Sequence, residues 1–241
     1  MATLDLDYFS PALTKMQRVS LLVPEFVDPP FHVLIQLHGL SDDESAWRRR
    51  SLIERRVEGL PLLVAMPDGG RGFYCDALQG YAYGTAIGVE LPVLLEQWFR
   101  LKPGWAIGGH SMGGYGAARL AMTYPNRFVS VACHSGAFHF GHGPYREDEL
   151  GAEGMLVAGE SPRGGPNDVY ALSRAVSPRP KLRFDCGVDD YVLESNRTLH
   201  SHLVEIGYGH EYVEFEGGHN WDYWDCHFPD ALAFHRMNLG F

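Results

Sequence analysis

The sequence of 241 residues contains little cysteine and no pair of cysteines close enough to form a metal or redox motif. The C-x-x-C spacing of a zinc ribbon or a redox dithiol is absent. We therefore expect reduced thiols, as in a cytosolic protein. The four cysteines are Cys75, Cys133, Cys186 and Cys226.

The amino terminus lacks the basic start and uninterrupted apolar stretch of a signal peptide, because residues such as Asp5, Lys15 and Arg18 interrupt it. We therefore expect a cytoplasmic protein with no membrane partner. Basic residues are also scarce, with 20 Lys and Arg against 30 Asp and Glu, which gives a net charge of −10. Such a charge repels polyphosphate at long range, so we expect no nucleic-acid partner.

Repeats and low-complexity linkers are absent as well, and the chain instead alternates between strand-like and helix-like segments. Its length and its 45% apolar content suit one domain spanning residues 1–241. Short apolar runs of the kind buried in parallel sheets predict five strands, and two flanking runs predict outer strands. The five runs are 31–37, 60–66, 105–107, 128–132 and 182–184, and the outer ones are 16–23 and 210–215.

Helical patterns lie between these runs. Residues 41–44 read as a capping box that opens a helix, residues 91–99 carry an apolar stripe, and a second stripe over 199–206 ends at Gly207. The alternation predicts an α/β fold with a mainly parallel sheet, covered on both faces, whose binding crevice lies at the carboxyl ends of the strands. Residues 138–180 break the alternation, so we expect a lid insertion there.

One segment has the pattern of a nucleophile elbow. Gly109-His-Ser-Met-Gly113 matches G-x-S-x-G and stands between an apolar strand and a helix-compatible segment. At such an elbow the serine takes a strained conformation, and the residues two before and two after it must be small. This context predicts an α/β-hydrolase fold with Ser111 as nucleophile. The amide of Met112 and the positive end of the following helix would face an oxyanion.

The remaining parts of a hydrolytic site follow from their order in the chain. A second oxyanion donor comes from the loop after an earlier strand, which predicts the Leu40 amide. The acid and then the histidine follow the serine in this fold. We predict Asp190 as the acid in preference to Asp189, because the acid usually stands three residues after the glycine, here Gly187. We predict His219, after paired glycines, as the base.

These segments together resemble the esterase D-like putative esterase family, which includes S-formylglutathione hydrolases, feruloyl esterases, tributyrin esterases and mycolyltransferases. The resemblance covers most of the chain. It rests on Gly-His-Ser-Met-Gly-Gly at 109–114, Leu-His-Gly-Leu at 37–40, the segment 66–74, Gly-Val-Asp-Asp at 187–190 and the segment 215–221. It implies a Ser111, Asp190 and His219 triad, oxyanion amides at Leu40 and Met112, and activity on small-molecule esters with no cofactor and no metal.

Within the family the chain is most similar to tributyrin- and feruloyl-type esterases, which implies short-chain or aromatic acyl esters as substrates. S-formylglutathione hydrolases have a Thr-Cys pair after the oxyanion loop, where this chain has Ser41 and Asp42. Thioester hydrolysis and acyl transfer remain alternatives. Several residues near the motifs are expected to line a substrate pocket, as an alternative to packing in the core. They are His110, Phe73, Tyr74 and Trp221.

Two functions of other classes compete with this interpretation. Histidines in the 134–142 segment, together with residues Asp222, Asp225 and His227, could form a metal site, but their spacing does not match one face of a helix. A non-catalytic hydrolase-like binding protein is disfavoured because every catalytic position is filled. The oligomeric state stays open, with a homo-oligomer as one possibility.

Overall fold

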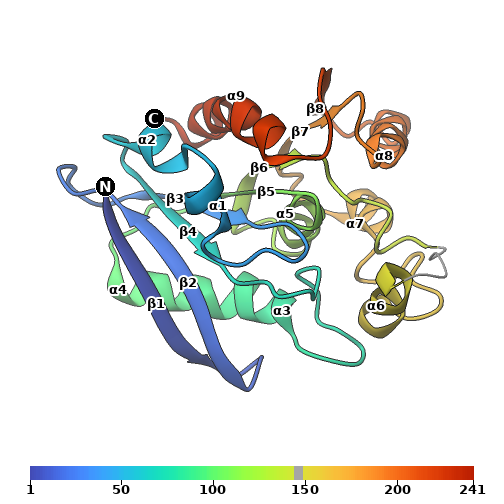
Figure 1. The fold of residues 1–241 in the computed structure, drawn as a ribbon, viewed down its shortest axis with the longest axis horizontal. Coiled ribbons are helices and arrows are strands. Elements are labelled where there is room, and N and C mark those ends of the chain that lie inside the picture. Colours follow the sequence, from blue (N-terminus) through green and yellow to red (C-terminus); the bar gives the residue numbers. More distant parts are fainter. Residues whose placement is uncertain (144–148) are drawn as a thin grey trace.

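The computed structural model describes residues 1–143 and 149–241, and within them eight strands form one sheet in the order β1-β2-β4-β3-β5-β6-β7-β8 (Figure 1). Strands β3 to β8 run parallel to one another, whereas β2 is antiparallel to both β1 and β4. The sheet is therefore mainly parallel. The strands are β1 (Ala2–Ser10), β2 (Lys15–Val23), β3 (His32–Leu37), β4 (Leu62–Pro67), β5 (Trp105–His110), β6 (Phe128–His134), β7 (Lys181–Gly187) and β8 (His210–Phe215).

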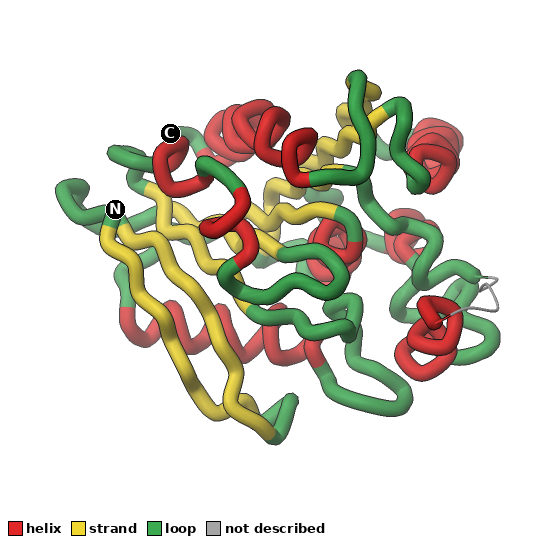
Figure 2. Tube along the Cα trace, in the orientation of Figure 1, coloured by secondary structure: helices red, strands yellow, loops and turns green. Residues whose placement is uncertain are grey.

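Helices cover both faces of this sheet (Figure 2). One buried apolar cluster joins the sheet to α4, α5, α7 and α8, and a second joins its other face to α1, α2 and α9. Two buried layers on a parallel sheet explain why its central strands read as continuous apolar runs. The helices are α1 (Ala46–Arg50), α2 (Ile53–Val57), α3 (Tyr83–Thr85), the π-helical η1 (Ala86–Glu90), α4 (Leu91–Trp98), α5 (Met112–Thr123), α6 (Glu149–Ala158), α7 (Val169–Ala175), α8 (Leu193–Glu205) and α9 (Trp221–Leu239).

The sequence-based predictions of the fold class and of the seven strands are confirmed, but the helix expected at residues 41–44 is not. Ser41 has φ +67°, whereas a capping residue has an extended backbone. The chain instead turns at Asp43, whose carboxylate accepts the Ser45 N–H at 3.0 Å, and α1 begins at Ala46. The helix expected to end before Gly207 is α8, and Gly207 has the positive φ of a C-terminal cap.

The predicted lid insertion, residues 138–180, includes residues 144–148, which lie outside the described part of the chain. Its described part carries α6 and α7, and α7 packs against α5. The lid and the single-domain assignment therefore stay predictions. Among the described residues, no helix combines the length and apolar character needed to span a membrane. All four cysteines lie in the described ranges, where they are free thiols, and only Cys226 is exposed.

Candidate active site

The turn between β5 and α5 holds Ser111 in a backbone conformation that few residues other than glycine adopt. Its φ is +54° and its ψ is −117°. The flanking glycines make this sharp turn sterically feasible, because a Cβ on Gly109 would lie 2.7 Å from the Gly113 carbonyl oxygen. Strained serines at such turns are typical of a nucleophile held clear of the sheet.

Replacing Gly113 by alanine should lower the free energy of unfolding by about 1–3 kcal/mol, as overpacking of a dense interior does. A Cβ at this position would lie 2.6 Å from the carbonyl oxygens of Leu37 and His38, which are backbone atoms that cannot rotate away. Urea unfolding followed by tryptophan fluorescence measures the loss. Gly209→Ala is the control, because a Cβ there meets nothing within 4 Å. Equal losses in both variants would contradict the explanation.

Three side chains from separate loops form a continuous hydrogen-bonded chain at the carboxyl edge of the sheet. His219 Nε2 lies 2.9 Å from Ser111 Oγ. His219 Nδ1 lies 2.9 Å from each carboxylate oxygen of Asp190. A carboxylate can only accept, so Nδ1 carries the proton, and Nε2 is left with a lone pair facing the serine hydroxyl. The arrangement can therefore take a proton from Ser111.

The loops after β7 and β8 are hydrogen-bonded to each other, and this brings Asp190 and His219 together. The Asp189 N–H donates to the Gly217 carbonyl oxygen at 2.9 Å. A Cβ on Gly187 would lie 2.2 Å from that same oxygen, so the close approach requires glycine there. Asp190 is 5% exposed and faces His219, whereas the neighbouring Asp189 is exposed.

Asp190 is held by groups that the sequence-based analysis did not identify. Burial alone would raise the pKa of Asp190, but hydrogen bonds from His219, the Val192 N–H and the Ser135 hydroxyl lower it overall. The Val192 N–H donates at 2.9 Å. The Trp224 indole N–H in turn donates to Ser135 Oγ at 3.1 Å. Ser135 directly follows β6, so only the folded chain brings it to Asp190.

A cavity of about 490 Å³ opens beside Ser111 and His219. It is lined by Leu40 of the loop after β3, by polar groups and by aromatic rings. Trp221, expected to line a pocket, lies on it, and so does His110. The other aromatic and polar groups on its wall, not predicted from the sequence to line a pocket, are Tyr191, Trp224, Ser41, Asp42, Arg50 and Asn220.

His110 lies between the rings of the cavity wall and is almost fully buried. Its ring centroid is 4.1 Å from that of Trp224 and 4.6 Å from that of Trp221. Burial lowers the pKa of His110 to about 4, although the nearby Asp42 carboxylate opposes that shift. A neutral ring packed in this way suits a wall residue rather than a base.

The structure does not place Phe73 and Tyr74 on this cavity, which corrects their expected role in substrate binding. Phe73 is 2% exposed and stacks on Phe140, with ring centroids 3.5 Å apart. Tyr74 is fully buried, and its hydroxyl donates to the His38 carbonyl at 2.9 Å. Both side chains belong to the first buried apolar cluster, where an aromatic residue is stabilised by burial of its surface.

The residues of the competing metal interpretation do not converge. His134 Nδ1 pairs with Asp185 at 2.9 Å, and His142 Nδ1 pairs with Asp168 at 3.0 Å. Within residues 1–143 and 149–241, no group of three or more His, Cys, Asp or Glu side chains could hold a metal ion.

The sheet order, the elbow and the loop positions define an α/β-hydrolase, and solved structures share this fold. FphF, a fluorophosphonate-binding serine hydrolase of Staphylococcus aureus solved with substrate bound, is 27% identical, with a TM-score of 0.86 over 97% of this chain and 98% of that one. The S-formylglutathione hydrolase FrmB of S. aureus is also 27% identical, with a TM-score of 0.84 over 97% and 98% of the two chains.

The family follows from the sequence comparison. Residues 10–235 match the model of the Putative esterase family, so the chain belongs to that family. An acetyl esterase of Caldicellulosiruptor saccharolyticus is 27% identical over 96% of this chain and 97% of that protein. The protein is therefore an esterase that hydrolyses carboxylic esters.

Proposed function

We propose that this protein is a serine esterase that hydrolyses short-chain or aromatic acyl esters through an acyl-enzyme on Ser111. The observation that carries the proposal is the unbroken chain from Ser111 Oγ through His219 to the Asp190 carboxylate, at the wall of a cavity. A serine hydroxyl is a weak nucleophile unless an adjacent base takes its proton. The hydrogen bond between His219 Nδ1 and the Asp190 carboxylate supports this role, because it favours the tautomer whose Nε2 lone pair faces the serine hydroxyl.

The first half-reaction forms the acyl-enzyme. Ser111 Oγ attacks the ester carbonyl carbon while its proton passes to His219 Nε2, and Asp190 stabilises the resulting imidazolium. The N–H groups of Leu40 and Met112 donate to the oxyanion of the tetrahedral intermediate. His219 then gives the proton to the leaving alcohol oxygen, and the C–O bond to the alcohol breaks. Water repeats the sequence on the acyl-enzyme and releases the acid.

The wall of the cavity favours the binding of small or flat acyl groups. Its wall combines the rings of Tyr191, Trp221 and Trp224 with polar side chains, and aromatic walls favour contact with short or planar groups. An acetyl group is small enough to lie within the cavity, which agrees with acetyl ester hydrolysis, the activity named for the C. saccharolyticus relative. Formyl thioester hydrolysis, the activity named for FrmB, is the second candidate because of that structural similarity.

A substrate panel tests this choice. Rates on nitrophenyl esters of increasing acyl length, on a feruloyl ester and on S-formylglutathione should give the highest kcat/KM for acetyl, butyryl or feruloyl groups. Acyl chains longer than the cavity can hold lose contact with its wall, so kcat/KM should fall for them. A maximum at decanoyl or longer chains would contradict the substrate class, and a maximum for S-formylglutathione would favour the second candidate.

The value of kcat/KM should rise with pH to a plateau, because a histidine base acts only in its unprotonated form. Neither Asp190 nor His110 should add a step to the profile at neutral pH. Asp190 stays ionised there because its pKa is lowered by its hydrogen bonds despite burial, and His110 stays neutral because burial lowers its pKa to about 4. Stopped-flow hydrolysis of an activated ester measures the profile. A flat profile with chemistry limiting would count against a histidine base.

A further inference from the structure

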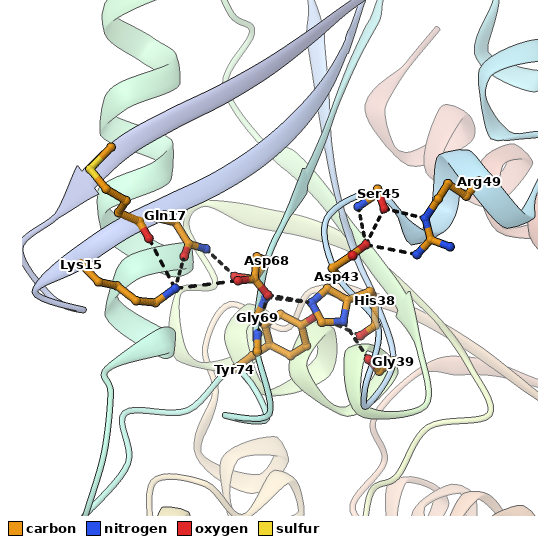
Figure 3. Close-up of polar contacts among 12 residues, drawn as sticks. Lys15, Gln17, His38, Gly39, Asp43, Ser45, Arg49, Asp68, Gly69 and Tyr74 are labelled. Atoms are coloured by element: carbon orange, nitrogen blue, oxygen red, sulfur yellow. Dashed lines mark hydrogen bonds and ion pairs between the residues drawn. The ribbon is translucent and has the colours of Figure 1, made fainter.

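Three hydrogen bonds hold the short segment that follows β3 (Figure 3). His38 Nδ1 lies 2.7 Å from the Gly39 carbonyl oxygen. The Gly69 N–H donates to His38 Nε2 at 2.8 Å, and the Tyr74 hydroxyl donates to the His38 carbonyl at 2.9 Å. His38 and Tyr74 are 1% and 0% exposed, so water does not compete for these bonds.

These contacts indicate which nitrogen of a neutral His38 ring carries the proton. A backbone N–H can only donate, so the Nε2 atom that faces Gly69 must offer a lone pair. In a neutral imidazole the proton is then on Nδ1, which donates to the Gly39 carbonyl. The Asp68 carboxylate is farther away, 3.6 Å from Nε2, beyond the usual range of a hydrogen bond.

The bond to Gly39 also determines the direction of a neighbouring amide. The Gly39 carbonyl and the Leu40 N–H belong to one trans peptide, which is planar, so the two groups point in opposite directions. Holding the carbonyl against His38 therefore points the Leu40 N–H away from His38. Leu40 lies on the cavity wall with Ser111. Among the residues that the structure describes, no protein acceptor takes the Leu40 N–H.

The loop after β4 that holds His38 is itself anchored. The Asp68 carboxylate accepts the Gly70 N–H at 2.8 Å, and the Asp68 carbonyl accepts the side-chain amide of Gln17 on β2 (Figure 3). A Cβ on Gly69 would lie 2.3 Å from the Tyr74 ring, so only glycine lets this backbone come so close. His38 is thus held by a fixed support and not by a free loop.

We propose that His38 is a positioning residue that aims the Leu40 N–H at the oxyanion, with Tyr74 holding the preceding peptide. The proposal rests on the proposed function, in which the Leu40 N–H is an oxyanion donor. A donor already aimed at the site needs no rearrangement as charge develops, so the benefit appears in the transition state. His38 should therefore affect kcat rather than KM.

Two variants of His38 separate its two ring contacts. The side-chain nitrogen of asparagine is bonded to Cγ, as Nδ1 is, so His38→Asn can still donate to the Gly39 carbonyl. The side-chain amide of glutamine lies where Nε2 of histidine lies. In His38→Gln the amide oxygen can therefore accept from the Gly69 N–H, but no side-chain nitrogen is placed to donate to the Gly39 carbonyl. We expect His38→Gln to lower kcat about 10–100-fold, less than the ~10²–10³ lost with a whole oxyanion donor, with KM nearly unchanged. His38→Asn should lose far less.

A trifluoromethyl ketone supplies a readout that a purely structural role would not change. This inhibitor forms a tetrahedral adduct with an oxyanion, so its Kd for His38→Gln should weaken by about the same factor as kcat, while the Kd of the unreactive methyl ketone stays the same. Tyr74→Phe keeps the ring and removes only the hydroxyl, and it should lower kcat by a smaller factor than His38→Gln does. Tyr74→Phe also tests the positioning of the segment after β3 if the His38 variants do not fold.

The outcomes are distinct. Wild-type kcat in His38→Gln, equal losses in the two His38 variants, or an unchanged inhibitor Kd would overturn the positioning role. If His38→Gln keeps its activity while Ser111→Ala loses it, only this proposal fails. Retained activity in Ser111→Ala would instead overturn the proposed function.

Discussion

Replacing Ser111 by alanine should reduce kcat by a factor on the order of 10⁶, as removal of a triad serine does. The change deletes one hydroxyl, which lies 2.9 Å from His219 Nε2. Without it no acyl-enzyme can form, and only binding and the oxyanion donors remain. Ester hydrolysis at saturating substrate measures the loss, and circular dichroism and thermal unfolding show that the fold is kept.

A matched serine serves as control for this experiment. Ser201 lies exposed on α8, so Ser201→Ala makes the same chemical change away from the site. It should leave kcat and KM at their wild-type values. Retention of most activity in Ser111→Ala would show that another residue is the nucleophile.

Replacing Asp190 by asparagine should reduce kcat by about 10⁴, because the amide favours the wrong tautomer of the histidine. In the wild-type protein the Asp190 carboxylate accepts a hydrogen bond from His219 Nδ1 at 2.9 Å. An asparagine amide can instead donate to Nδ1, and the proton then moves to Nε2, where it blocks the transfer from Ser111. Steady-state kinetics on a nitrophenyl ester measures the effect.

Asp189→Asn is the neighbouring control, since the Asp189 side chain is exposed and only its backbone N–H bonds across to Gly217. Its kcat should change by far less. The opposite ranking would move the acid by one residue, and two mild variants would place the acid elsewhere, with Asp222 the next residue to examine.

Much of the fold could be predicted from the sequence because its signals are local. The apolar runs, the elbow with glycines on both sides of Ser111 and the glycine pair before His219 are each patterns of a few neighbouring residues. The parallel sheet then brings its carboxyl ends to one edge, so motifs far apart in the chain could be expected to meet. The edge strand β1 was missed, although its alternating residues from Leu4 to Tyr8 are typical of a half-buried strand.

The parts that could not be predicted depend on contacts between distant elements. Ser135 reaches Asp190, and Trp224 reaches Ser135, only after β6, β7 and α9 have packed. Phe73 and Tyr74 stand beside a motif and were expected at the pocket, but an aromatic ring near a site is as often part of the core. The backbone of Ser41 rules out a capping box that the residue pattern alone favours.

Active-site labelling tests the central claim, that His219 activates Ser111 as the nucleophile, most directly. The protein is treated with a fluorophosphonate, digested, and the modified residue is located by mass spectrometry. The account predicts a single adduct on Ser111, with labelling strongly slowed in His219→Ala and absent in Ser111→Ala. An adduct on another residue, or labelling of Ser111 at an unchanged rate in His219→Ala, would contradict it.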